Sequence, residues 1–181
     1  MVIASAGDIV TMEALAAADI LRQQAPALKV RFVNIVDLMV LHSNHNHPHG
    51  MKKDDFERYF GNNVPVIFAF HGYAGAIHSL VHGQSNPQRF HVRGYEENGT
   101  TTTPFLMTVL NEICRFHLAR HVIKHCNNKP NNAEPLTDWC TKQIKQATDY
   151  AEEHFMDEEE ITNWTWKYGQ EAPEKGNPTK E

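Results

Sequence analysis

The stretch Val64-Pro65-Val66-Ile67-Phe68-Ala69-Phe70 is the strongest strand signal in the sequence and decides the fold class. It holds no polar side chain and ends at His71-Gly72. A strand with one face in solvent alternates apolar and polar residues, whereas a parallel strand covered by helices on both faces is apolar throughout. The run therefore predicts a buried strand of a parallel sheet.

The first 36 residues predict two more strands of the same sheet. Val2–Ser5 is a short apolar run, and residues 30–36 (VRFVNIV) are β-branched and mostly apolar. Between them, apolar residues recur at the spacing of one helical face, at positions 10, 14, 17 and 21. Gly7-Asp8 supplies the turn and the N-cap, and Pro26 ends the helix. A helix between two buried strands implies a parallel pair with a right-handed crossover.

The remaining residues predict one further strand and four helices. The strand is Phe90–Tyr95, and short helices are expected at 52–60 and 74–81. Thr103 and Pro104 then suit the N-cap and first position of a long helix. Apolar residues at 105, 109, 113, 116 and 122 keep helical register, so we expect this helix to run unbroken to about His125. A second long helix is expected over 136–151.

The order of these elements predicts the architecture. Strands alternate with helices, which indicates an α/β fold, an open three-layer sandwich with a mainly parallel sheet. We expect a single domain over residues 1–156. Residues 157–181 end in a Pro/Gly/Lys/Glu stretch and are expected to form a partly disordered tail.

Composition excludes several classes of protein. The chain has 181 residues and a formal net charge of −5, which favours neither nucleic acid nor an anionic membrane as a partner. No apolar run reaches the length of a bilayer span, and no secretory signal is visible. The three cysteines (114, 126 and 140) are widely spaced and form no CxxC motif, which is typical of a cytoplasmic protein with reduced thiols.

Two patterns imitate ligand sites. Gly7-Asp8 with Asn34 downstream resembles the Mg²⁺ ligands of thiamine-diphosphate enzymes, but Ile9 replaces the second glycine and Asn34 falls inside a predicted strand. We interpret Gly7-Asp8 as a helix cap and expect no cofactor-binding residue here.

Histidines form the second pattern. His42, His45, His47 and His49 share one loop with no ligand from another segment, and the stripe at 117, 121 and 125 lacks the Glu of HExxH. We expect no metal site at either place.

Residues 93–103 suggest an anion site or an interdomain contact instead. Arg93 offers a planar set of donors, and Thr100, Thr101, Thr102 and Thr103 precede a helix start whose free N–H groups attract negative charge. Because ligands gather beyond the carboxyl ends of parallel strands, we expect these residues to converge there with His71. The alternatives are a plain capping loop, and surface pairing of Arg93 with Glu96 or Glu97.

Long blocks of this chain resemble one family. The blocks 68–73 (FAFHGY), 91–105 (HVRGYEENGTTTTPF), 109–118 (VLNEICRFHL), SAGD at 5–8, HPHG at 47–50 and Trp164-Thr165-Trp166 are similar to the closing domain of bacterial phosphoketolases. The resemblance covers nearly the whole chain. It implies a fold like that of the transketolase C-terminal domain.

The resemblance also implies a function. Phosphoketolases use thiamine diphosphate and Mg²⁺ to cleave xylulose 5-phosphate, and often fructose 6-phosphate, with phosphate into acetyl phosphate and an aldose phosphate. Their cofactor sits between the two preceding domains, so the resemblance implies no catalytic residue and no cofactor in this domain. The implied partners are the preceding domains of the same polypeptide, in a homodimer or larger homo-oligomer. The alternative is a stand-alone regulatory or anion-binding module without catalysis.

Overall fold

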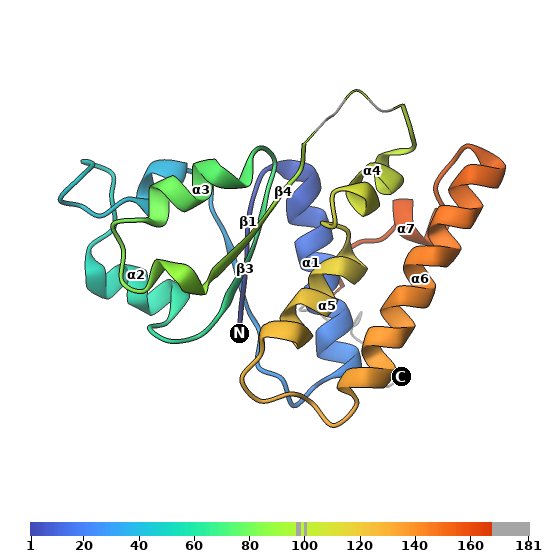
Figure 1. Cartoon of the computed structure of the whole chain (residues 1–181), viewed down its shortest axis with the longest axis horizontal. Helices are drawn as coiled ribbons and strands as arrows, with labels where there is room; N and C mark the ends of the chain where they lie inside the picture. Colours follow the sequence, from blue (N-terminus) through green and yellow to red (C-terminus); the bar gives the residue numbers. More distant parts are fainter. Residues whose placement is uncertain (97–98, 100, 168–181) are drawn as a thin grey trace, which may run out of the picture.

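The computed structural model describes residues 1–96, 99 and 101–167, and its centre is a sheet of parallel strands (Figure 1). The strands are β1 (Val2–Ala6), β2 (Arg31–Asn34), β3 (Val66–Phe70) and β4 (Phe90–Gly94), in the order β2-β1-β3-β4. Ile3 pairs with Phe32 on one side and Ile67 on the other. The parallel sheet expected from the sequence is confirmed.

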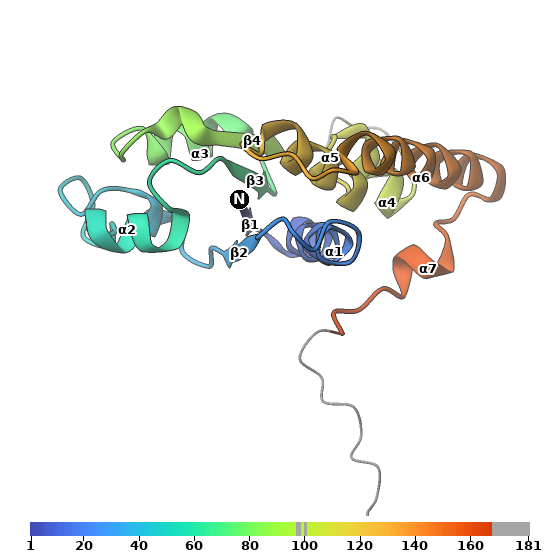
Figure 2. The same ribbon diagram turned by 90° about the horizontal axis from the view of Figure 1, so that it is seen from below.

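Helices cover both faces of the sheet (Figure 2). On one face lie α2 (Lys53–Phe60) and α3 (Ala74–Val81), with the short 3-10 turns η1 (Leu38–Leu41) and η2 (Pro87–Arg89) in the same half of the chain. On the other face lie α1 (Asp8–Gln24) and α5 (Arg115–His125), and α6 (Ala133–His154) packs on α5 on the side away from the sheet. This is the α/β sandwich predicted above.

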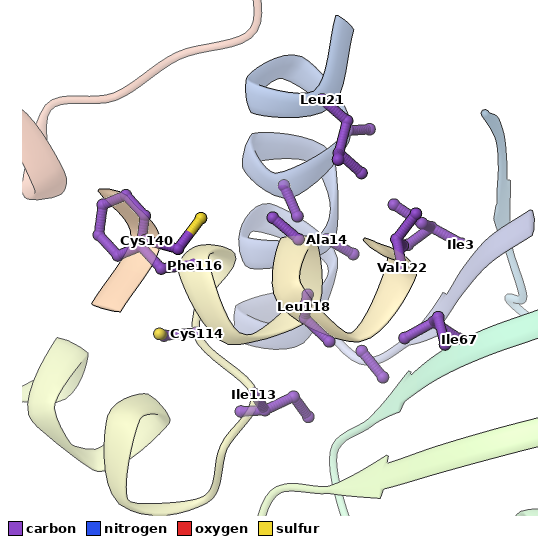
Figure 3. Packing of buried hydrophobic residues seen from close by; sticks show 14 of the residues in the cluster. Ile3, Ala14, Leu21, Ile67, Ile113, Cys114, Phe116, Leu118, Val122 and Cys140 are labelled. Carbon is purple, nitrogen blue, oxygen red and sulfur yellow. The ribbon is translucent and has the colours of Figure 1, made fainter. Parts of the chain in front are cut away.

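Alternate residues of the two central strands, β1 and β3, feed two separate cores. Ile3 and Ile67 are fully buried against α1 and α5, and Figure 3 shows Leu118 and Val122 of α5 beside them. The neighbouring residue Phe68 points to the opposite side and is fully buried with the side chains of α2 and α3. Burial on both faces is the reason why these strands carry no polar alternation.

The expected helix from Thr103 to His125 is wrong. The chain forms α4 (Pro104–Leu110), then a turn, then α5. Glu112 has a positive φ of 53°, and the N–H groups of Ile113 and Cys114 both donate to the carbonyl of Thr108. The side chain of Asn111 stabilises the turn, because its Oδ1 accepts the N–H of Glu96 at 2.9 Å.

Residues beyond the expected boundary at 156 still contact the domain. Asp157 bonds to the start of α4, and Ile161, in the short helix α7 (Glu159–Thr162), joins the core that contains α1 and α5. The boundary at 156 stays a prediction. The partial disorder expected for residues 157–181 stays a prediction, and residues 168–181 lie outside the described residues.

Candidate functional site

The carboxyl ends of β1, β3 and β4 meet at one edge of the sheet. The N–H of His71 donates to the carbonyl of Ala6 at 3.0 Å, and the N–H of Tyr95 donates to that of Phe70 at 2.7 Å. The His71 and Tyr95 rings then meet edge to face, with centroids 4.8 Å apart. The carboxyl ends of β1, β3 and β4 and the residues that follow them are therefore in direct contact, and we call their surface the carboxyl edge.

Gly7 lets β1 and β3 approach so closely. A Cβ at this position would lie 2.4 Å from the Cβ of His71, and Gly7 has a φ of +117°. Both features exclude a side chain, since such a contact is far inside van der Waals distance and the backbone conformation favours glycine. Gly7, which the sequence predicts to form a turn, therefore also allows the residues after β1 to pack against His71 at the end of β3.

Asp8 is held by protein donors. Its Oδ1 accepts the N–H of Ile9 at 2.8 Å and lies 3.3 Å from Nδ1 of His71. The backbone hydrogen bond first, and the His71 contact second, lower the pKa of this carboxyl below its ordinary value. Asn34 contacts a different residue: its Oδ1 accepts from the hydroxyl of Thr11 at 3.4 Å. The expectation that Asp8 and Asn34 hold no cofactor stays a prediction.

Arg93 does not project freely from the carboxyl edge. Its Nη1 lies 3.2 Å from Oε2 of Glu112, and its Nη2 lies 3.5 Å from Nδ1 of His121. The guanidinium thus joins β4 to the α4–α5 turn and to α5. Glu112 had no signal in the sequence, because it was expected to lie on the surface of an unbroken helix.

The start of α4 already holds a carboxylate from the same chain. Asp157 accepts hydrogen bonds from the hydroxyl of Thr103 and from the N–H of Phe105, the latter at 2.9 Å. Thr103 also caps the helix by accepting the N–H of Leu106. Thr101 is exposed and Thr102 half-buried, and Thr100 lies outside the described residues. The role of these threonines in an anion site or an interdomain contact stays a prediction.

The loop histidines lie near one another without converging. His49 contacts Asp37, with Nδ1 and Oδ2 3.1 Å apart, and the His42 and His47 rings stack at 5.8 Å between centroids. Across residues 1–96, 99 and 101–167, no group of three or more His, Cys, Asp or Glu side chains is placed to hold a metal ion. The same stretch has no helix long and apolar enough to cross a membrane.

The histidine stripe of α5 faces β4 and the turn before α5. His117 Nδ1 lies 3.2 Å from Sγ of Cys114, and the His125 ring stacks on His91 with centroids 3.7 Å apart. Burial lowers the pKa of His121 to about 3, and the charge of Arg93 adds to this effect. Burial also raises the pKa of the Cys114 thiol to about 12, so that this sulfur is no nucleophile.

The chain was then compared with known proteins. Residues 1–166 match the family model of the XFP C-terminal domain. The chain is 51% identical over 168 residues to a probable phosphoketolase of Brucella abortus (strain 2308), which covers 93% of this chain and 21% of that protein.

Two further relatives are also phosphoketolases by name. Probable phosphoketolase 2 of Rhizobium meliloti (strain 1021) is 47% identical over 165 residues, and probable phosphoketolase 2 of a Nostoc species is 47% identical over 168. These alignments cover 91% and 93% of the chain, and 21% of each relative. The chain thus spans about a fifth of the length of the curated relatives it matches. With its parallel α/β sheet and a match that runs from residue 1 to residue 166, the chain belongs to the family of phosphoketolase C-terminal domains.

Proposed function

We propose that this chain is the C-terminal domain of a cytoplasmic phosphoketolase that depends on thiamine diphosphate and Mg²⁺. The enzyme cleaves xylulose 5-phosphate, and fructose 6-phosphate as well, with phosphate to give acetyl phosphate and an aldose phosphate. The observation that carries this proposal is the 51% identity, spread over 93% of the chain, to a relative of which the alignment covers only 21%. The chemistry belongs to the other four fifths of the polypeptide.

In this proposal the domain docks on the preceding domains and supplies no catalytic group. Exposed apolar side chains support the docking role. Among the described residues, four of the eight large hydrophobic side chains that are exposed lie within six residues after the carboxyl end of β1, β2 or β3, namely Ile9, Met12, Val36 and Tyr73. Val36 is 94% exposed and Tyr73 is 70% exposed. Burial of such side chains in an interface is favourable, at about 25 cal/mol per Å².

The family assignment is tested by grafting. Residues 1–166 replace the matching segment of the Brucella abortus relative, and acetyl phosphate formation from xylulose 5-phosphate and phosphate is measured. We expect the graft to retain activity within about tenfold of its host, because half of the residues are identical. A folded graft that assembles like its host but forms no acetyl phosphate would count against the proposal.

The docking role is tested with a matched pair of tyrosines in the same graft. Tyr73 lies at the carboxyl edge, whereas Tyr59, 46% exposed, lies near the opposite edge, where its carbonyl accepts from Arg31 at the start of β2. Tyr73→Asp should lower the melting temperature and the yield of assembled enzyme, and Tyr59→Asp should not. Equal effects of the two substitutions would remove the carboxyl edge as the docking surface.

A further inference from the structure

A groove of about 720 Å³ opens between β4, α5 and the first turns of α6. One wall is the outer face of α5, where His117, Arg120, His121 and Lys124 follow one another at helical spacing. Arg93 of β4 and Lys129 of the α5–α6 loop extend this wall. We call it the cationic wall.

Three cations of the groove form no ion pair with a described residue. Glu112 pairs with Arg93, but no carboxylate of the described residues lies within 4.0 Å of the charged nitrogens of Arg120, Lys124 or Lys129. Glu134 and Asp138 line the groove on α6, and neither forms an ion pair with a described cation there. Arg120, Lys124 and Lys129 therefore lack a carboxylate in contact within residues 1–96, 99 and 101–167.

His121 adds a buried donor to this wall. Its Nδ1 lies 3.5 Å from Nη2 of Arg93, and a guanidinium can only donate, so Nδ1 accepts and Nε2 carries the proton. Nε2 is buried and has no hydrogen-bond partner among the described residues. A buried donor without an acceptor is costly, and an acceptor seated in the groove against His121 would relieve that cost.

We propose that this groove binds a small phosphate-bearing anion through Arg120, Lys124 and His121. A phosphate group presents several acceptor oxygens in a tetrahedral arrangement, which suits a guanidinium, an ammonium and an imidazole N–H converging from one helix face. Arg93 and Lys129 add further positive charge to the same wall. Burial first, and the charge of Arg93 in addition, lower the pKa of His91, His117, His121 and His125.

The test is calorimetric titration of the 181-residue chain with inorganic phosphate at constant ionic strength. We expect saturable binding. The affinity should weaken about tenfold in Arg120→Gln and about tenfold in the separate variant Lys124→Gln, because each variant loses a charge-assisted hydrogen bond. Lys142→Gln is the matched control, since Lys142 is an exposed lysine of α6 outside the groove and without an ion pair. It should bind phosphate like the unmodified chain.

Two further arms make the result decisive. Phosphate should shift the ring ¹⁵N resonances of His121 and raise its pKa, whereas the loop residue His45 should not respond. Malonate, a dicarboxylate of similar charge, should bind at least tenfold more weakly. Saturable malonate binding as strong as that of phosphate would overturn the assignment to phosphate. A weak, non-saturating response to phosphate that is the same in Lys142→Gln and Arg120→Gln would overturn the site itself. Lys124 is exposed, so its variant remains informative if Arg120→Gln fails to fold.

Discussion

The carboxylate of Glu13 and the guanidinium of Arg115 form a buried, two-pronged ion pair across 102 residues of sequence. Nε of Arg115 donates to Oε2 at 3.0 Å and Nη2 donates to Oε1 at 2.6 Å, while the backbone N–H of Arg115 donates to Oε2 at 2.7 Å. Only 8% of the Arg115 side chain and 7% of the Glu13 side chain are exposed. This pair links the middle of α1 to the start of α5, at the centre of the helical layer that covers one face of the sheet.

Replacing Glu13 by Gln should destabilise the domain by about 3–5 kcal/mol, because it leaves a buried guanidinium without its counter-charge. Urea unfolding followed by circular dichroism measures this loss. The control is Asp149→Asn, which breaks the exposed pair with Lys145 and should cost less than about 1 kcal/mol. Similar losses in the two variants would show that burial of the Glu13–Arg115 pair has no special role.

Replacing Asp157 by Ala should cost about 1–2 kcal/mol, since the start of α4 loses the acceptor of Thr103 and of the Phe105 N–H. Amide hydrogen exchange should show faster exchange confined to α4. Glu160→Ala provides the comparison, because that side chain is exposed in α7. Unchanged protection of α4 in the Asp157 variant would contradict the capping role.

Stability should fall as the pH drops below about 6.5, where histidine titrates in an unfolded chain. Burial lowers the pKa of His91, His117, His121 and His125 in the folded state, so protons bind preferentially to the unfolded chain. Below the ordinary value the folded state therefore loses stability, and for His121 the loss continues toward pH 3. Unfolding free energies measured between pH 8 and pH 5 should decrease by about 2 kcal/mol through His121.

Two substitutions assign this pH dependence. His121→Gln should reduce the slope of the unfolding free energy against pH, because an amide does not titrate and can still accept from Arg93. His45→Gln, in the exposed loop, should leave the curve unchanged. A curve that keeps its slope in His121→Gln would place the acid sensitivity elsewhere.

The isolated chain should not bind thiamine diphosphate with Mg²⁺. Asp8 is bonded to Ile9 and His71, and Asn34 faces the Thr11 hydroxyl, so neither is arranged as a ligand of a diphosphate-bound cation. Calorimetry with the cofactor and Mg²⁺ should give no heat of binding. Micromolar affinity would mean that part of the cofactor site lies within this domain, and the division of labour proposed above would be wrong.

Metal removal should leave the domain intact. His49 contacts Asp37, and the rings of His42 and His49 each contact that of His47. We therefore expect the melting temperature to be the same before and after dialysis against a chelator. A fall of several degrees would indicate a structural metal, since such sites contribute folding free energy directly.

The sheet and its edge could be predicted because they depend on local patterns. The runs around Ile3 and Ile67 are apolar without interruption, and parallel strands bring their carboxyl ends together wherever they form. The contact between His71 and Tyr95 lies at the edge where β3 and β4 end. Local composition and one topological rule were sufficient for this part of the molecule.

The parts that could not be predicted depend on contacts between distant segments. Val109, Ile113 and Phe116 fit one continuous helix by spacing, and the break at Glu112 comes from the bond between Asn111 and the backbone of Glu96. Asp157 caps a helix that starts more than fifty residues earlier, and nothing near it in the sequence shows this. Glu13 did carry a signal, because it is a carboxylate beside the apolar face of α1, and such a residue requires a buried partner.

The position of Asp157 also sets the order in which a ribosome can complete this fold. The start of α4 lacks its acceptor, and Arg115 lacks the Trp164 ring that lies 5.5 Å from its guanidinium carbon, until residues 157–164 have been synthesised. A nascent chain that stalls before residue 157 therefore presents an uncapped helix and a partly uncovered ion pair to the proteases and chaperones of the cell. The domain can thus close over α4 and α5 only after the whole of α6 has left the ribosome.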